Sequence, residues 1–202
     1  MTTQYREKAL KIVRGSGLVR PRDLVSAGVP AWALYELVKS GHVEQVARGV
    51  YQRKNHPATE HHSYAEAIKR VPQGIVCLLS ALRFHELTVQ NPAEVWLAIS
   101  RTAWRPWAGD GVQIHFVRYS GKGLTAGIES HIVEGVQVLV TSVARTVADC
   151  FKYRNKIGRD VALEALQEGW RQKRFTMDDL WRYAELCRVT KVMLPYLETV
   201  SP

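Results

Sequence analysis

Apolar positions in the first forty residues recur with the period of an α-helix, in three short segments. Residues 4–14 place their apolar side chains on one side of a helix, and glycines follow directly. Residues 21–27 open with a proline, which suits a first helical position. The third segment begins at Pro30 and ends at Gly41. Its core-facing positions, at helical spacing, are Leu34, Leu37 and Val38.

Two runs of β-forming residues follow the third helical segment. They lie on either side of Arg48 and Gly49, where glycine permits the positive φ of a tight hairpin turn. Three short helices followed by a two-stranded wing are typical of a winged helix-turn-helix, whose usual partner is duplex DNA. We therefore predict such a domain over residues 1–54, with the third helix as the recognition helix.

The pattern changes after a polar linker, and residues 59–202 are predicted to form a second, α+β domain. An amphipathic helix is expected before Pro72, and a largely buried apolar block follows at residues 75–87. Helical patterns return from residue 142 onward. Strands grouped in the middle, with helices after them, favour a small mixed sheet and argue against a doubly wound parallel one. The expected strands are residues 95–99, 112–117, 128–133 and 136–140.

Positive charge is concentrated in the N-terminal segment. Residues 1–54 carry ten Lys or Arg against four acids, which is +6 of the chain's formal +9. A protein must neutralise phosphates before it reads base edges, so this distribution favours one DNA-binding domain over a uniformly basic surface. Solvated helix faces are the alternative explanation for the same charges.

The expected DNA contacts follow from position and charge. The third helix is not strongly basic, because Lys39 is accompanied by Glu36. We therefore assign most phosphate contacts to cations near the second helix and on the wing, and we assign base contacts to aromatic residues on the outer face of the third helix. The predicted DNA-binding residues are Arg20, Arg22, Trp32, Tyr35, Lys39, Arg48, Arg53 and Lys54.

The composition indicates a cytoplasmic protein. The chain has 202 residues, and its longest apolar run falls far short of the roughly 18 residues of a membrane span. The N-terminal residues are polar and unlike a secretory signal. Cys77, Cys150 and Cys187 are far apart and lie among apolar neighbours, which indicates three packed thiols and not a disulfide or zinc framework.

Several polar groups are candidate sites by residue type. His56, His61 and His62 match no familiar zinc spacing, so a solvated linker is the better interpretation. His85 lies in an apolar block, where a buried and hydrogen-bonded histidine is the expected state. Arg145 and Asp149 stand at i and i+4, and as an exposed pair they would contribute about 0.3 to 0.5 kcal/mol.

An aromatic and cationic segment lies between the first two predicted strands. Trp104, Arg105 and Trp107 surround a proline there. Such a loop suits a hot spot for a protein partner or a stacking surface for a nucleotide, although packing beneath the loop explains it equally well. We predict a partner-binding role for these three residues.

The sequence lacks recognisable catalytic signatures. No grouping of carboxylates with a lysine is typical of a nuclease, no glycine-flanked serine elbow occurs, and no glycine-rich phosphate loop is present. We expect no cofactor, no metal and no catalytic residue. The alternative is a metal-dependent, nuclease-like enzyme that the winged domain delivers to nucleic acid, and its cleavage would require a divalent ion.

Three blocks carry a resemblance to a known family: the wing end at residues 48–51, the block at residues 76–88, and residues 142–149. Together they resemble AbiEi-type antitoxins of type IV toxin-antitoxin (abortive infection) systems over nearly the whole chain. On the wing the matching residues are Arg48, Gly49 and Tyr51, and Arg20 and Arg22 correspond to basic residues around the second helix.

The resemblance implies both a function and partners. Such a protein represses its own operon by binding inverted repeats in the promoter, and its C-terminal domain counters a nucleotidyltransferase-like toxin. Because inverted repeats offer two half-sites, pairing of protomers on DNA is expected. The third helix departs from the family pattern because it carries little charge, and this departure concerns sequence-specific reading of bases.

Overall fold

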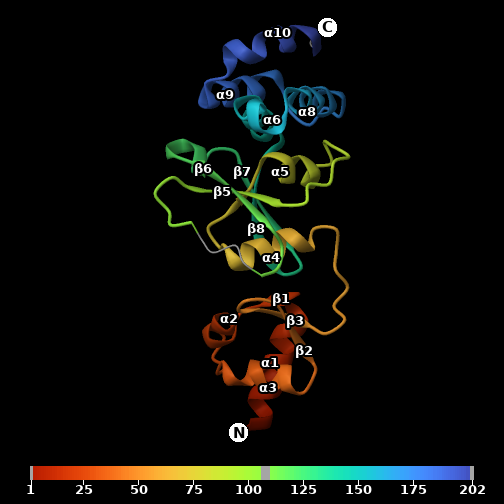
Figure 1. Ribbon diagram of the computed structural model, residues 1–202, viewed down its shortest axis with the longest axis vertical. Helices are drawn as coiled ribbons and strands as arrows, with labels where there is room; N and C mark the ends of the chain where they lie inside the picture. Colours follow the sequence, from red (N-terminus) through yellow and green to blue (C-terminus); the bar gives the residue numbers. More distant parts are fainter. Residues whose placement is uncertain (1, 106–109, 201–202) are drawn as a thin grey trace. The chain divides into compact units, whose positions relative to one another are not determined.

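The N-terminal elements form a winged helix-turn-helix in the computed structural model, which describes residues 2–105 and 110–200 (Figure 1). The three predicted helices and both wing strands are confirmed, and Gly49 has a φ of 72° at the wing turn. The three-stranded sheet has the order β1-β3-β2 and is antiparallel. Its elements are α1 (Thr2–Gly15), β1 (Leu18–Val19), α2 (Pro21–Ser26), α3 (Trp32–Lys39), β2 (Val43–Ala47) and β3 (Val50–Arg53).

A mixed sheet of five strands follows, in the order β6-β5-β4-β8-β7. The four predicted strands are present, and the short β4 between them was not predicted. It pairs antiparallel with β5 and parallel with β8, where Ile75 lies opposite Leu139. The elements are α4 (His62–Arg70), β4 (Ile75–Val76), α5 (Leu78–Phe84), β5 (Val95–Ser100), β6 (Ile114–Tyr119), η1 (Gly121–Leu124), β7 (Ile128–Val133) and β8 (Val136–Thr141).

Helices form the C-terminal part, as expected for an α+β protein. Helix α6 packs against α5, α8 and α9. Thr176 caps α9 by accepting the backbone N–H of Asp179. Pro195 lies inside the last helix at an exposed position, where water can satisfy the carbonyl that lacks an N–H partner. The elements are α6 (Val143–Lys152), α7 (Arg154–Ile157), α8 (Arg159–Arg171), α9 (Met177–Cys187) and α10 (Thr190–Val200).

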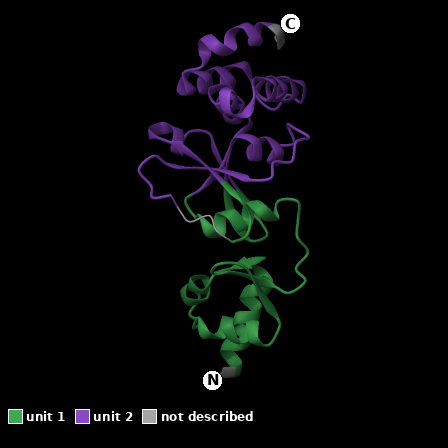
Figure 2. Ribbon diagram, viewed as in Figure 1, with its two compact units in different colours: residues 1–73, 106–114, 131–138 green, residues 74–105, 115–130, 139–202 purple. Residues whose placement is uncertain are grey.

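The chain divides into two compact units (Figure 2). The first contains residues 1–73, 106–114 and 131–138, so the tip of the β7–β8 hairpin belongs with the winged helix and α4. The second contains residues 74–105, 115–130 and 139–202. A domain boundary after residue 54 stays a prediction.

Each unit has its own apolar core. In the first, buried side chains of α1, α3 and the wing pack together, including Ala9, Leu34 and Leu37. In the second, the core gathers around α6, and its three cysteines are buried free thiols, as predicted. None of the helices in the described part of the chain has the length and apolar character needed to cross a lipid bilayer.

Candidate nucleic-acid interface

The outer face of α3 carries large aromatic side chains that remain accessible. Leu34 and Leu37 are fully buried, whereas Trp32 is 41% and Tyr35 46% exposed. Leu34 and Leu37 lie three positions apart on the inward side, so helical spacing turns Trp32 and Tyr35 outward together. The predicted division of this helix into a core face and an outer face is thus confirmed.

Aromatic contacts connect this face to its neighbours. The ring of Tyr35 meets the edge of Tyr51 on β3, with centroids 6.2 Å apart, and Trp32 meets Tyr5 of α1 at 6.1 Å. Such edge-to-face pairs stabilise the relative placement of two elements. Burial, and then the adjacent Tyr35, raise the pKa of the Tyr51 phenol above its ordinary value, so the contact stays neutral at physiological pH. The outer face of α3 and the wing therefore form one surface.

Exposed cations lie on α3, on and beside the wing, and on α2. Lys39 ends α3, Arg48 occupies the wing turn, and Arg53 ends β3. Lys54 follows directly, and its backbone N–H donates to the carbonyl of His42 at 3.1 Å. Arg22 is exposed on α2. We call this set, with Trp32 and Tyr35, the wing surface, and its role in binding DNA stays a prediction.

Arg20 is placed differently from the other predicted contacts. Its Nη1 donates to the carbonyl of Lys69 at 2.6 Å, and Lys69 in turn forms a 2.6 Å ion pair with Asp23. Burial, and then the neighbouring Arg22, lower the pKa of Arg20, although its guanidinium stays protonated at physiological pH. The hydrogen bond of Arg20 therefore connects the start of α2 to α4, so its guanidinium has a structural role within the first unit.

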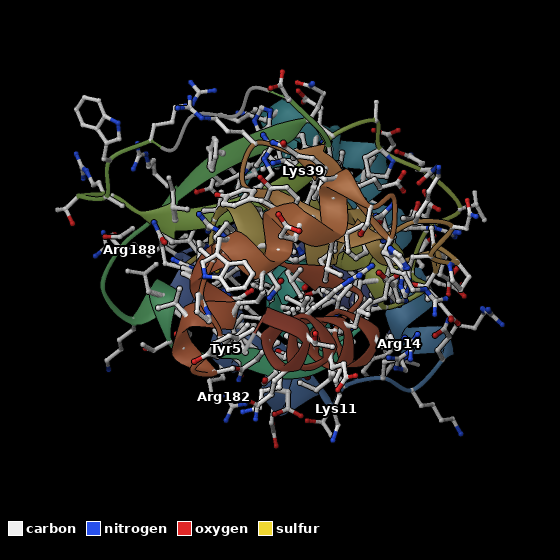
Figure 3. The ribbon with its side chains drawn as sticks, turned by 90° about the horizontal axis from the view of Figure 1, so that it is seen from below. Tyr5, Lys11, Arg14, Lys39, Arg182 and Arg188 are labelled. Carbon is white, nitrogen blue, oxygen red and sulfur yellow. The ribbon has the colours of Figure 1, made fainter. Side chains whose placement is uncertain are left out.

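Helix α1 contributes further cations away from the wing surface. Lys11 and Arg14 are exposed, and Figure 3 shows them extending from α1 on the side of the view opposite Lys39. Lys8 and Lys11 border a shallow apolar cavity with Ile12 and Val29. The exposed positive charge of the N-terminal segment is thus not confined to the wing surface.

A single buried carboxylate, that of Glu134, holds the linker that follows the wing. We call Glu134 with His56, Thr59 and His62 the Glu134 cluster. Glu134, at the tip of the β7–β8 hairpin, has a side chain that is 3% exposed. Its Oε1 accepts from the backbone N–H and the hydroxyl of Thr59 at 2.9 and 2.8 Å, and its Oε2 accepts from Nδ1 of His62 at 2.7 Å. Nε2 of His56 lies 3.6 Å from the same oxygen.

The interpretation of these histidines as a solvated linker was therefore wrong for His56 and His62. The sequence did not indicate Glu134 as their partner, because it follows more than seventy residues later. The hairpin tip also contacts the winged segment, where the N–H of Gly17 donates to the carbonyl of Glu134 at 2.8 Å. A Cβ at Gly17 would lie only 2.8 Å from Cβ of Glu134, so this close approach requires glycine.

The Glu134 cluster predicts a pH-dependent contribution to stability. Burial alone would raise the pKa of the Glu134 carboxyl, but the hydrogen bonds from Thr59 and then His62 outweigh burial and hold it below its ordinary value of 4.5. A depressed folded-state pKa gives stability that is present above the unfolded pKa and is lost as pH falls through the folded one. We expect Glu134→Gln to lower the unfolding free energy at pH 7, and this difference to shrink steadily below pH 4.5.

Urea unfolding at several pH values measures this difference, with Glu7→Gln as the control because Glu7 is exposed on α1 of the same unit. A Glu134→Gln deficit that is equal at pH 7 and at acidic pH would contradict the role of the ionised carboxylate.

Arg145 and Asp149 form a buried network in the second unit and not a surface pair. Their side chains are 2% and 0% exposed, and Nε of Arg145 lies 2.9 Å from Oδ2 of Asp149. The Tyr119 hydroxyl donates to the same oxygen at 2.7 Å, and the Cys187 thiol donates to Oδ1 at 3.1 Å. The stabilisation of about 0.3 to 0.5 kcal/mol expected for an exposed ion pair therefore does not apply to Arg145 and Asp149.

His85 is buried and donates from Nε2 to the carbonyl of Thr141 at 2.7 Å, as predicted.

The predicted partner loop is described only in part. Trp104 is 90% exposed, and the guanidinium of Arg105 lies over the ring of Phe116 at 5.5 Å. Trp107 lies outside the described residues. The exposed indole of Trp104 is compatible with a partner contact, which stays a prediction.

The helices, the short β1 and the wing define a winged helix-turn-helix. Residues 7–54 match the model of a family described as "Transcriptional regulator, AbiEi antitoxin". The resemblance to AbiEi-type antitoxins is thereby confirmed for this segment, which is about a quarter of the chain. No curated protein matches the chain significantly.

Proposed function

We propose that this protein binds duplex DNA through its wing surface and represses transcription of its own operon as the antitoxin of a type IV system. The observation that carries the proposal is the edge contact between Tyr35 and Tyr51, which unites α3 and the wing into one surface bordered by exposed cations. The match of residues 7–54 to the regulator family supports the same function.

Each part of the wing surface has a distinct role in this proposal. Arg22, Arg48 and Arg53, with the two lysines, neutralise phosphates and set the register on the duplex. Trp32 and Tyr35 enter the major groove with α3, where apolar and hydroxyl contacts discriminate base edges. Two protomers occupy the two halves of an inverted repeat in the promoter.

The remainder of the chain engages the toxin in this proposal. Residues 59–202 act as the antitoxin domain against a nucleotidyltransferase-like toxin in the cytoplasm, with Trp104 and Arg105 in the contact. No catalytic step is included. Within residues 2–105 and 110–200, no group of three or more His, Cys, Asp or Glu is arranged to hold a metal ion, so no specific observation favours the nuclease alternative.

The decisive experiment measures binding of the purified protein to its own upstream DNA and to a scrambled duplex, at two salt concentrations with a chelator present. Selective binding that survives chelation and falls steeply with salt is the expected result. Equal affinity for both duplexes would refute the autorepressor function, and divalent-ion-dependent cleavage would favour the enzyme.

Replacing a wing cation tests the surface itself. We expect Arg48→Ala to weaken binding to all sequences and to reduce the slope of log K against log salt by about one unit, because one phosphate contact is lost. The matched control is Arg14→Ala, which removes an exposed cation of the same unit from α1. If Arg14→Ala reduces the slope and Arg48→Ala does not, the DNA lies on the α1 face and the wing surface is the wrong interface.

A further inference from the structure

A cavity of about 390 Å³ lies in the second unit, lined by residues from β6, η1, α6 and the end of α9. Five of its ten lining residues are cations, and none is an acid. The cations are Arg118, Lys122, Arg145, Lys152 and Arg188. The predicted DNA contacts and the partner loop do not include any of them.

The positive charge of this cavity is largely uncompensated. Asp149 neutralises Arg145 from below, through the buried pair described above. Among the described residues, the other four cations form no ion pair with a carboxylate. Burial, and then Asp149, raise the pKa of the Cys187 thiol to about 12, so this wall adds no negative charge at neutral pH. Four cationic residues without a carboxylate partner in the described part of the chain thus line one small volume.

One of the cations is held by backbone carbonyls, and another occupies a left-handed backbone position. Nη1 of Arg118 donates to the carbonyls of Ser100 and Ala103 at 2.8 and 2.5 Å, which fixes the guanidinium. Arg188 follows α9 as its C-cap residue and has a φ of 60°, a left-handed conformation that glycine or asparagine usually takes at this position. A non-glycine residue has a conformational cost there.

We propose that this cavity binds a small anion that carries at least two phosphoryl groups. Phosphoryl oxygens accept the charge-assisted hydrogen bonds that Arg and Lys donate, and a polyanion matches four uncompensated charges better than a single carboxylate does. The volume lies within the range of about 300 to 1,000 Å³ that is typical of small-ligand sites. Two of the lining residues, Tyr119 and Arg145, are buried, which favours a compact ligand over the backbone of a duplex.

Calorimetric titration of the full-length protein with pyrophosphate, and separately with adenosine triphosphate, tests the proposal. We expect one ligand per chain, and an affinity that falls about tenfold or more in the double variant Lys122→Ala/Arg188→Ala, because two charge-assisted contacts are lost. The matched control is Lys191→Ala, an exposed cation three residues after Arg188 that does not line the cavity. Circular dichroism of each variant shows that its fold is retained.

Three outcomes would overturn the proposal. The first is no binding of either probe to the wild-type protein, and the second is an equal loss in Lys191→Ala, which would indicate nonspecific attraction. The third is a loss of duplex DNA or RNA affinity in the double variant without pyrophosphate binding, which would assign these cations to nucleic acid. Arg48→Ala, which tests the wing surface, should leave pyrophosphate binding unchanged, so the two proposals fail separately.

Discussion

Replacing Asp149 by leucine should lower the unfolding free energy of the second unit by about 3 to 5 kcal/mol, because it leaves the Arg145 charge buried without its partner. Leucine has the same branched arrangement of four side-chain heavy atoms as aspartate, so the change removes the charge and keeps the branching of the side chain. Burial opposes the charged form of Arg145, yet the attraction of Asp149 is stronger and raises the pKa of the guanidinium. Arg145 therefore stays charged in the variant's folded state only at a large cost.

A double-mutant cycle separates the pair from its surroundings. Arg145→Met should also destabilise strongly, whereas Arg145→Met combined with Asp149→Leu should cost less than the sum of the two single changes, since both buried charges are gone. Urea unfolding gives the free energies, and hydrogen exchange of α6 assigns the transition to this unit. Asp178→Leu is the control, because Asp178 is exposed. Additive losses, or a loss below about 1 kcal/mol for Asp149→Leu, would mean that the pair acts as a surface salt bridge.

For this pair, the sequence predicts the contact between the two side chains but not their burial. The spacing of Arg145 and Asp149 was sufficient to predict that they meet, because neighbours at i and i+4 share a helix face. Their burial was not predictable, since Tyr119 and Cys187, which enclose Asp149, come from β6 and α9. Glu134 was missed for a similar reason. Its partners Thr59 and His62 are distant in sequence, and only the folded hairpin brings them together.

Local periodicity explains the part of the fold that was predicted. The three N-terminal helices, the wing and the four longer strands each carry a repeat that is visible within a single segment. The strands β1 and β4 have two residues each, which is too short for any repeat. They exist because long-range partners complete them: Tyr51 for β1, and Leu139 for β4.

The wing surface was predictable for a different reason. On α3, the inward positions Leu34 and Leu37 determine which residues turn outward, so the exposure of Trp32 and Tyr35 follows from spacing alone. The contact of Arg20 with α4 could not be predicted from spacing. The sequence does not show whether a cation is exposed or donates to a backbone carbonyl that is distant in the chain. Exposed residues are therefore predicted most reliably on helices whose apolar spacing identifies the buried face.

Leu37 belongs to the core face of α3, beneath the wing surface. Leu37→Ala should lower the unfolding free energy of the first unit by about 2 to 5 kcal/mol. The side chain is fully buried in the cluster that joins α3 to α1 and the wing, so its removal leaves a cavity beneath α3. Hydrogen exchange of peptides within residues 1–54 measures the loss, with faster exchange expected in α1 and α3. Val25→Ala is the matched control, because Val25 belongs to the same unit but is 58% exposed.

The same variant distinguishes a folding defect from a lost DNA contact. Leu37 lies under the wing surface and not on it. Under the proposed function, Leu37→Ala should therefore lower the fraction of protein able to bind DNA while the salt slope of the remaining folded molecules stays unchanged. Arg48→Ala should do the opposite, with normal hydrogen exchange and a smaller slope. Normal exchange in Leu37→Ala would mean that α3 is placed by other contacts and that its inward face has been assigned wrongly. A reduced slope of log K against log salt in Leu37→Ala would instead indicate that α3 shifts on the core without unfolding. Its cations would then no longer contact DNA phosphates.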